Sequence, residues 1–181
     1  SLAVHSISSN SMRLGLTYST HPEKNVEISN TDAEVSWILS FAIERASKYK
    51  RNLLLDFATL TGAARVALGE DLPAYFSNDE NIAKKIEKLN QKKLRCWRLP
   101  LFEPYKVKLN SDVAHLCNAS LDGMAGAITA ALFLKEFLKS PVPPWVHFDT
   151  FAWSSGSILS TKGAALQGLD IMIDFLENNY H

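Results

Sequence analysis

The sequence has few cysteines, no net charge and no long hydrophobic run. Its two cysteines, Cys96 and Cys117, lie in no CxxC pair and in no histidine-rich cluster, so the spacing predicts neither a disulfide framework nor a thiolate zinc site. Nineteen basic residues balance nineteen acidic ones. A chain without net charge has no overall electrostatic field to attract nucleic acid or an anionic membrane. We therefore expect reduced thiols and no nucleic acid as a partner.

The most apolar stretch, residues 125–134, is about half as long as a membrane span. The N-terminal residues show neither a basic region nor the apolar core of a secretion signal. We expect no membrane association and a cytoplasmic location.

Apolar periodicity is the main structural signal in the 181 residues. Continuous apolar runs at residues 53–58 and 146–151 predict buried parallel strands, and residues 84–93 read as a solvated helix face. Alternating strands and helices predict an α/β fold, a three-layer α/β/α sandwich with a mainly parallel sheet. Residues 1–24 are expected to form an N-terminal loop or arm, and residues 25–181 the domain itself. Helical periodicity predicts helices over residues 35–48, 63–68, 125–138 and 164–176.

The first candidate for chemistry is the acidic pair Asp32 and Glu34, at a strand-to-helix junction. Two carboxylates at this spacing can offer hard oxygen ligands to a divalent metal ion. The alternative is a capping box, in which Thr31 and Glu34 satisfy the first backbone amides of the helix. Spacing alone favours the cap.

The second candidate is the turn after the strand at 53–58, which holds Thr59, Leu60 and Gly62. Small and hydroxyl residues there can expose backbone groups to a ligand, whereas the alternative is a tight turn that needs Gly62 for close packing. The residue types alone do not decide between these two interpretations. His147 lies in an apolar run and is interpreted as a hydrogen-bonded core residue rather than a metal ligand, and Asp149 is treated with the same caution.

Seven segments carry a further signal. They are SSNSMRLG at 8–15, VEISNTDAE at 26–34, DFATLTGAARVALG at 56–69, WRLPL at 97–101, SDVA at 111–114, GAITAALFL at 126–134 and WVHFD at 145–149. In these segments, and in their order, nearly the whole chain resembles the C-terminal part of the catalytic domain of the cytosolic leucyl aminopeptidase family.

The resemblance implies a metal-dependent exopeptidase that removes N-terminal amino acids from peptides with two divalent ions, zinc, manganese or magnesium. By this resemblance Asp32 and Glu34 correspond to metal ligands. Leu60 and Gly62 correspond to residues whose backbone contacts the peptide, and Thr59 to a residue that lines the pocket for the first side chain. Family members assemble as hexamers, so we expect a homo-oligomer or another stable partner.

The sequence departs from the family pattern at positions near the family's active site. Val35 and Ser36 stand where the family has glycine and an anion-holding arginine, so no catalytic residue is assigned in this chain. Phe151 replaces a smaller residue near the substrate pocket, and residues 162–165 depart from a glycine-rich segment. The family's other metal ligands, a lysine and two aspartates, precede the matched segment. The sheet is therefore expected to be incomplete relative to the family's catalytic domain.

These departures predict that the chain alone is inactive, holds metal weakly or not at all, and acts through assembly or binding. A peptide would be a substrate only if the site were completed. The alternative hypothesis is a fragment of an active metalloaminopeptidase whose upstream half is missing. A decaying gene product without a selected role is a third possibility.

Overall fold

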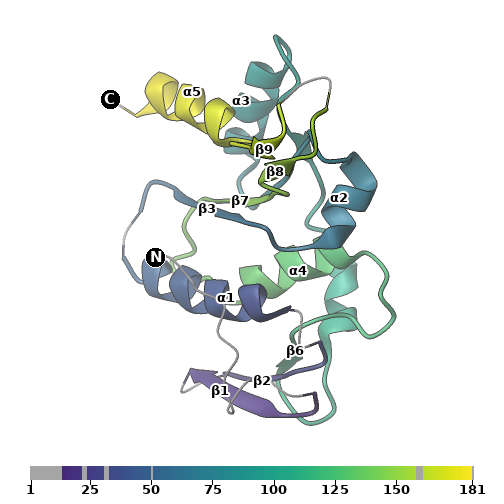
Figure 1. Cartoon of the computed structure of the whole chain (residues 1–181). Helices are drawn as coiled ribbons and strands as arrows, with labels where there is room; N and C mark the ends of the chain where they lie inside the picture. Colours follow the sequence, from purple (N-terminus) through teal and green to yellow (C-terminus); the bar gives the residue numbers. More distant parts are fainter. Residues whose placement is uncertain (1–13, 22–23, 31–32, 50, 158–160, 181) are drawn as a thin grey trace. The chain divides into compact units, whose positions relative to one another are not determined.

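The structure, a computed structural model, describes residues 14–21, 24–30, 33–49, 51–157 and 161–180 (Figure 1). The chain divides into two compact units, and each is built from two stretches of sequence. Unit 1 comprises residues 1–51 and 102–143, and unit 2 comprises residues 52–101 and 144–181. Within the described ranges, no helix has the length and apolar character needed to cross a membrane.

Unit 1 contains a three-stranded sheet with the strand order β1-β2-β6. Strands β1 and β2 are antiparallel, and β2 and β6 are parallel. Part of the segment expected to be a loop or an arm is therefore a strand, because Thr17 and Tyr18 belong to β-favouring types and pair with β2. The elements are β1 (Thr17–His21), β2 (Lys24–Glu27), α1 (Glu34–Ser47), the 3₁₀ helix η2 (Glu103–Leu109), β6 (Leu116–Cys117) and α4 (Gly126–Lys135).

Unit 2 contains a four-stranded sheet with the order β3-β7-β4-β5 and a small antiparallel pair, β8 and β9. The β3–β7 and β4–β5 pairings are parallel, and the β7–β4 pairing is antiparallel. The elements are β3 (Leu54–Ala58), α2 (Gly62–Leu68), β4 (Ala74–Ser77), α3 (Glu80–Asn90), β5 (Trp97–Arg98), β7 (Trp145–Asp149), β8 (Trp153–Ser154), β9 (Gly163–Ala164) and α5 (Leu169–Asn179).

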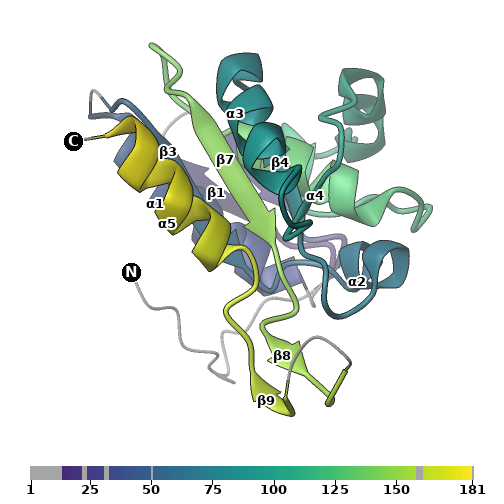
Figure 2. The same ribbon diagram turned by 90° about the horizontal axis from the view of Figure 1, so that it is seen from above.

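The core of unit 2 lies between one face of this sheet and the helices α3 and α5, which run beside β7 in Figure 2. Phe148 is fully buried there and stacks on Phe57, with 4.8 Å between ring centroids. Successive side chains of a strand point to opposite faces, so Phe148 joins this core while His147 and Asp149 lie on the other face. The predicted α/β class with a mainly parallel sheet is confirmed.

The predicted parallel strands at 53–58 and 146–151 are observed as β3 and β7, which pair in register from Leu54 opposite Trp145 to Ala58 opposite Asp149. Burial is as expected for β7, whose five residues are all buried. The expectation is wrong for β3, whose residues are only partly buried. Its place at the edge of the sheet explains the difference, because an edge strand has a neighbour on one side only.

The helices predicted at 35–48, 63–68 and 125–138 are observed as α1, α2 and α4. The charged segment at 84–93 lies mostly on α3, which buries Ile82 and Ile86 and exposes its lysines. The helix expected at 164–176 begins later, because Gly163 and Ala164 pair with β8. Gly168, with φ 79°, is the N-cap from which α5 starts.

Candidate functional site

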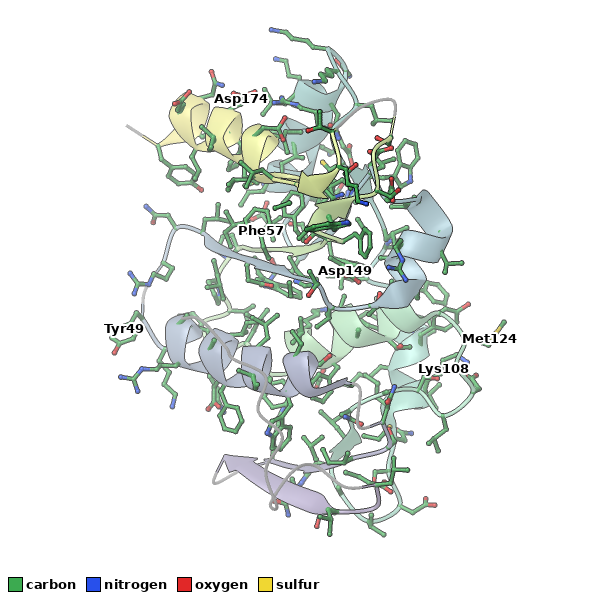
Figure 3. The ribbon with its side chains drawn as sticks, in the orientation of Figure 1. Tyr49, Phe57, Lys108, Met124, Asp149 and Asp174 are labelled. Atoms are coloured by element: carbon green, nitrogen blue, oxygen red, sulfur yellow. The ribbon has the colours of Figure 1, made fainter. Side chains whose placement is uncertain are left out.

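The carboxylate of Asp149 holds the turn between β3 and α2. Leu60 and Thr61 donate their backbone N–H groups to its Oδ1, with N···O distances of 3.1 and 3.0 Å. The Thr61 hydroxyl donates to Oδ2 at 2.6 Å. Figure 3 shows Asp149 at the end of β7, beside the turn that leads into α2. One side chain therefore fixes the turn that the family resemblance assigns to substrate contact.

Asp149 is 2% exposed, and burial raises the pKa of its carboxyl while the hydrogen bonds from Thr61 and Leu60 oppose that rise. The Thr61 hydroxyl also accepts the N–H of Ala64 at 3.1 Å and so caps α2. An ionised carboxylate can only accept, so the Thr61 hydroxyl proton points to Asp149 while its oxygen accepts from the helix. The turn is thus held in one hydrogen-bonded arrangement.

The three predicted substrate-contacting residues lie on this turn. Thr59 and Gly62 are exposed, and Leu60 is half-buried. A Cβ built on Gly62 would meet no atom within 4 Å in the described part of the chain. Close packing therefore does not require glycine here, which counts against the packing alternative. Open space therefore lies next to Gly62, and another molecule can enter it.

Gln167 holds the segment that follows β7. Its Oε1 accepts the backbone N–H groups of Phe151 at 3.0 Å and Ala152 at 2.8 Å, and its Nε2 donates to the carbonyl of Glu70. Ala152 has φ 55°, a left-handed conformation that costs an alanine free energy. These hydrogen bonds keep Ala152 in that conformation and hold Phe151 next to it.

The ring of Phe151 lies against α2. The guanidinium of Arg65 stands 4.4 Å from the ring centroid, within cation–π distance. Arg65 is exposed and belongs to the helix that begins at the Leu60–Gly62 turn. The helix that follows the candidate turn therefore carries a cation, Arg65, against which the bulky ring of Phe151 packs.

His147 is fully buried and paired with a carboxylate. Its Nδ1 lies 2.5 Å from Oδ1 of Asp56, whose other oxygen accepts the indole N–H of Trp145 at 2.6 Å. The interpretation of His147 as a hydrogen-bonded core residue is confirmed. Its Nε2 is buried and has no hydrogen-bond partner within the described ranges.

In unit 1, Asn118 plays a part similar to that of Asp149. Its Oδ1 accepts the backbone N–H groups of Ser29 at 2.8 Å and Asn30 at 3.0 Å, and its Nδ2 donates to the carbonyl of Asn30 at 2.6 Å. The Ser29 hydroxyl adds a contact of 3.1 Å to the same oxygen. Asn118 is buried and follows β6, so it fixes the chain just before the acidic segment.

The predicted metal ligands lie at the start of α1. Asp32 and Thr31 fall outside the described residues, and Glu34 is the first residue of the helix. The N-cap assigned to this helix is Ala33, which makes no side-chain capping bond. The capping box involves Thr31, which lies outside the described residues, so this alternative stays a prediction. The ligand hypothesis for the carboxylate pair likewise stays a prediction.

Ser36, which the resemblance aligns with the family's arginine, is 3% exposed. Serine is neutral and cannot supply the fixed positive fork of a guanidinium.

The described residues contain no cluster of three or more His, Cys, Asp or Glu side chains that could hold a metal ion. Asp32 and Glu34 would add two carboxylates, whereas a dinuclear site must hold two like-charged ions and needs a larger anionic set. The donors among the described residues do not make up a dinuclear centre, and no chemical step is derived through one.

Sequence patterns do not predict the roles of Asn118 and Gln167, and they favour a core role for Asp149. Each acts on backbone distant in sequence, 88 or 89 residues away for Asn118 and Asp149. For Asn118 and Asp149 the sequence carries a signal, a polar residue at the end of a short apolar run, which marks the carboxyl end of a strand.

A family model described as "Cytosol aminopeptidase family, catalytic domain" matches residues 1–172. A probable cytosol aminopeptidase of Legionella pneumophila (strain Corby) is 40% identical over 160 residues, which cover 87% of this chain and 33% of that protein. One from Chlamydia abortus is 44% identical over 147 residues, covering 80% of this chain and 29% of the relative. The chain thus spans about a third of the length of these relatives.

Two solved structures have a fold similar to that of this chain. The cytosol aminopeptidase of Coxiella burnetii has a TM-score of 0.89 and 44% identity, with 97% of this chain and 39% of that chain covered. A K354E mutant of tomato leucine aminopeptidase has a TM-score of 0.83 and 32% identity, with 96% and 34% covered. From the matched motifs, the fold and the held β3–α2 turn together, we conclude that this chain belongs to the cytosol aminopeptidase family.

Proposed function

We propose that this 181-residue chain is by itself catalytically inactive and acts through assembly or binding. It keeps the substrate turn of a family whose reaction is the metal-dependent removal of N-terminal amino acids from peptides. The observation that carries the proposal is the buried Ser36 in the first turn of α1. A neutral hydroxyl there cannot hold the small anion that the family's arginine holds.

The turn at Thr59–Gly62 supports the binding part of this proposal. Asp149 fixes the backbone of Leu60 and Thr61, and open space lies next to Gly62. A preorganised backbone loses little freedom when a ligand binds, which favours contact with a peptide main chain. We infer that a peptide N-terminus is the ligand class, and that it is a substrate only where the metal site is completed.

Two surfaces support assembly, with either a second copy or the upstream half of a family member as the partner. Strand β3 is an edge strand with partly buried residues, a position that can pair with another strand. Exposed apolar side chains on α1 include Val35, Ile38 and Phe41. Such a group of apolar side chains is typical of an interaction surface. The cytosolic names of the relatives and the two free cysteines support a cytoplasmic location.

A chimera tests the proposal against the alternative of an interrupted but competent enzyme. The upstream part of the Coxiella burnetii relative, joined to residues 1–181, would supply the ligands that precede the matched segment. We expect this chimera to fold, assemble and hydrolyse leucine amide poorly with excess Mn²⁺. The matched Ser36→Arg chimera should be faster by about 100-fold, because a positioned charge is restored.

A chimera that keeps Ser36 and turns over as fast as the Coxiella burnetii relative would overturn the proposal in favour of the alternative. An Asp32→Ala chimera serves as the background control, because it removes a predicted metal ligand without altering the substrate turn.

A further inference from the structure

Arg65 is an exposed arginine on α2, three residues after Gly62. Residues three apart in a helix are neighbours on one face. The Arg65 side chain therefore lies on the same side of α2 as the open space next to Gly62. A molecule bound at the Thr59–Gly62 turn that continues along this face meets the guanidinium.

The positive charge of Arg65 has no ion-pair partner among the residues that the structure describes. The other two arginines of unit 2 differ in this respect, because Arg95 and Arg98 each pair with two carboxylates. Helix α2 has no acidic residue of its own. Arg65 therefore keeps its capacity to bind an anionic group from outside the chain.

The carboxylates at the two ends of α2 are engaged elsewhere. Before the helix, Asp149 accepts two backbone N–H groups and the Thr61 hydroxyl. After the helix, Glu70 accepts the Ser155 hydroxyl, at 2.6 and 2.8 Å from its two oxygens. Neither forms an ion pair with the guanidinium.

Phe151 holds the guanidinium on the side of α2 that faces the end of β7. The guanidinium lies over the ring, 4.4 Å from its centroid, and Gln167 fixes the backbone of Phe151. The preceding residue, Thr150, donates its N–H to the carbonyl of Ala58 at 2.9 Å, directly before the turn. A guanidinium over an aromatic ring can still donate the N–H groups at its edges.

We propose that Arg65 binds a carboxylate of the peptide that the Thr59–Gly62 turn holds. Peptides with a negative charge beyond their first residue are then the preferred ligands. The planar guanidinium matches a carboxylate with two parallel hydrogen bonds. This inference rests on the proposed binding of a peptide at the turn, and it requires no metal ion. An acidic side chain and a free C-terminal carboxylate share this chemistry, and the test separates them.

Three dipeptides are titrated into the 181-residue chain and followed by two-dimensional NMR. Leucyl-glutamine amide is the reference without a carboxylate. Leucyl-glutamate amide adds a side-chain carboxylate, and leucyl-glutamine with a free C-terminus adds a main-chain one. We expect at least one of these two to bind about three- to fivefold more tightly than the reference, as a well-oriented exposed ion pair allows. Sodium chloride at about 0.5 M should remove most of this preference.

Two variants and one control locate the preference. Arg65→Gln should lower the affinity of the favoured peptide to that of leucyl-glutamine amide. Phe151→Leu keeps the charge but removes the ring under it, so the preference should fall to about twofold. Arg51→Gln is the matched control, because Arg51 is also exposed and lies 5.2 Å from the ring centroid of Tyr49, but belongs to unit 1. It should leave all three affinities unchanged.

The outcomes separate this inference from the function on which it rests. Equal affinity for the three peptides, or a preference that survives in Arg65→Gln, would overturn the role of Arg65 and leave the turn as a peptide site. Absence of saturable shifts at residues 60–62 with every peptide would overturn both this inference and the peptide binding proposed for the turn.

Discussion

Two buried side chains, one in each unit, perform the same task with different chemistry. Asn118 follows β6 and holds the backbone of Ser29 and Asn30, whereas Asp149 ends β7 and holds the backbone of Leu60 and Thr61. Asn118 both accepts and donates, so it satisfies an N–H and a carbonyl of the same residue. Asp149 only accepts, and it takes three donors.

We call each of these side chains a clamp, a buried side chain that holds a turn by hydrogen bonds. The difference between them shows the free-energy cost of burying each one. A buried amide is neutral and adds no dependence on pH, whereas a buried carboxylate must be desolvated and depends on its donors to stay charged. In return, hydrogen bonds to a charged acceptor are stronger than those to a neutral one. The carboxylate should therefore make the larger contribution to its turn, and the predictions below test that ranking.

Asp149→Ala should have the largest effect, a loss of about 3 kcal/mol in the free energy of unfolding. The change leaves two N–H groups and the Thr61 hydroxyl without their acceptor. Urea denaturation measures the loss, and hydrogen exchange locates it, with faster exchange expected at Leu60, Thr61 and Ala64. Asp149→Asn keeps the shape and one acceptor oxygen and should cost less than half as much. Unchanged exchange in Asp149→Ala would refute the clamp.

Asn118→Ala should cost about 2 kcal/mol, with faster exchange confined to Ser29 and Asn30. The hydrogen bonds lost are those to the backbone of these two residues. Asn118→Asp is the informative control. It places a carboxylate oxygen against the Asn30 carbonyl, so its loss should be largest at neutral pH and recover on acidification. A larger loss for Asn118→Ala than for Asp149→Ala would reverse the ranking.

The pH dependence of stability should separate the two clamps next. The pKa of Asp149 is raised in the folded chain, so the folded state binds more protons than the unfolded state just above the unfolded value of about 3.9. Its contribution to stability therefore falls as pH rises from about 4 through the folded pKa. Asp149→Asn should flatten the profile in that window, and Asn118→Ala should leave the slope unchanged. Identical slopes in all three proteins would contradict the raised pKa.

The smallest effect is expected at two alanines with left-handed backbone, Ala125 in unit 1 and Ala152 in unit 2, with φ of 58° and 55°. Glycine adopts this conformation without the Cβ penalty. Ala152→Gly and Ala125→Gly should each raise the melting temperature, by a gain of about 0.5 to 1 kcal/mol after the entropy cost of glycine. Ala131→Gly, in the middle of α4, is the matched control and should destabilise instead.

Local patterns allowed most of the fold to be predicted. The apolar runs that became β3 and β7 and the helical periodicity of α1, α2 and α4 are properties of short windows. The start of α5 could not be predicted in this way, because Gly163 and Ala164 are held by pairing with β8. The partial burial of β3 likewise depends on its place in the sheet.

The candidate site also combines residues with a local sequence signature and residues whose role depends on distant contacts. Thr59, Leu60 and Gly62 could be located because a βα turn has a local signature. Their clamp, Asp149, could not, because its role depends on contacts 88 and 89 residues away in sequence. The loss at Ser36 could be predicted only from the family resemblance, since a buried serine in a helix has no pattern of its own.

The most direct test of the account is an assay of leucine amide hydrolysis by the purified 181-residue chain with excess Mn²⁺ or Zn²⁺, alongside calorimetric titration of the metal. The account predicts no turnover above the metal-only background and weak or undetectable metal binding. Robust turnover by this chain that disappears in Asp32→Ala would contradict it, because the two carboxylates would then belong to a working metal site.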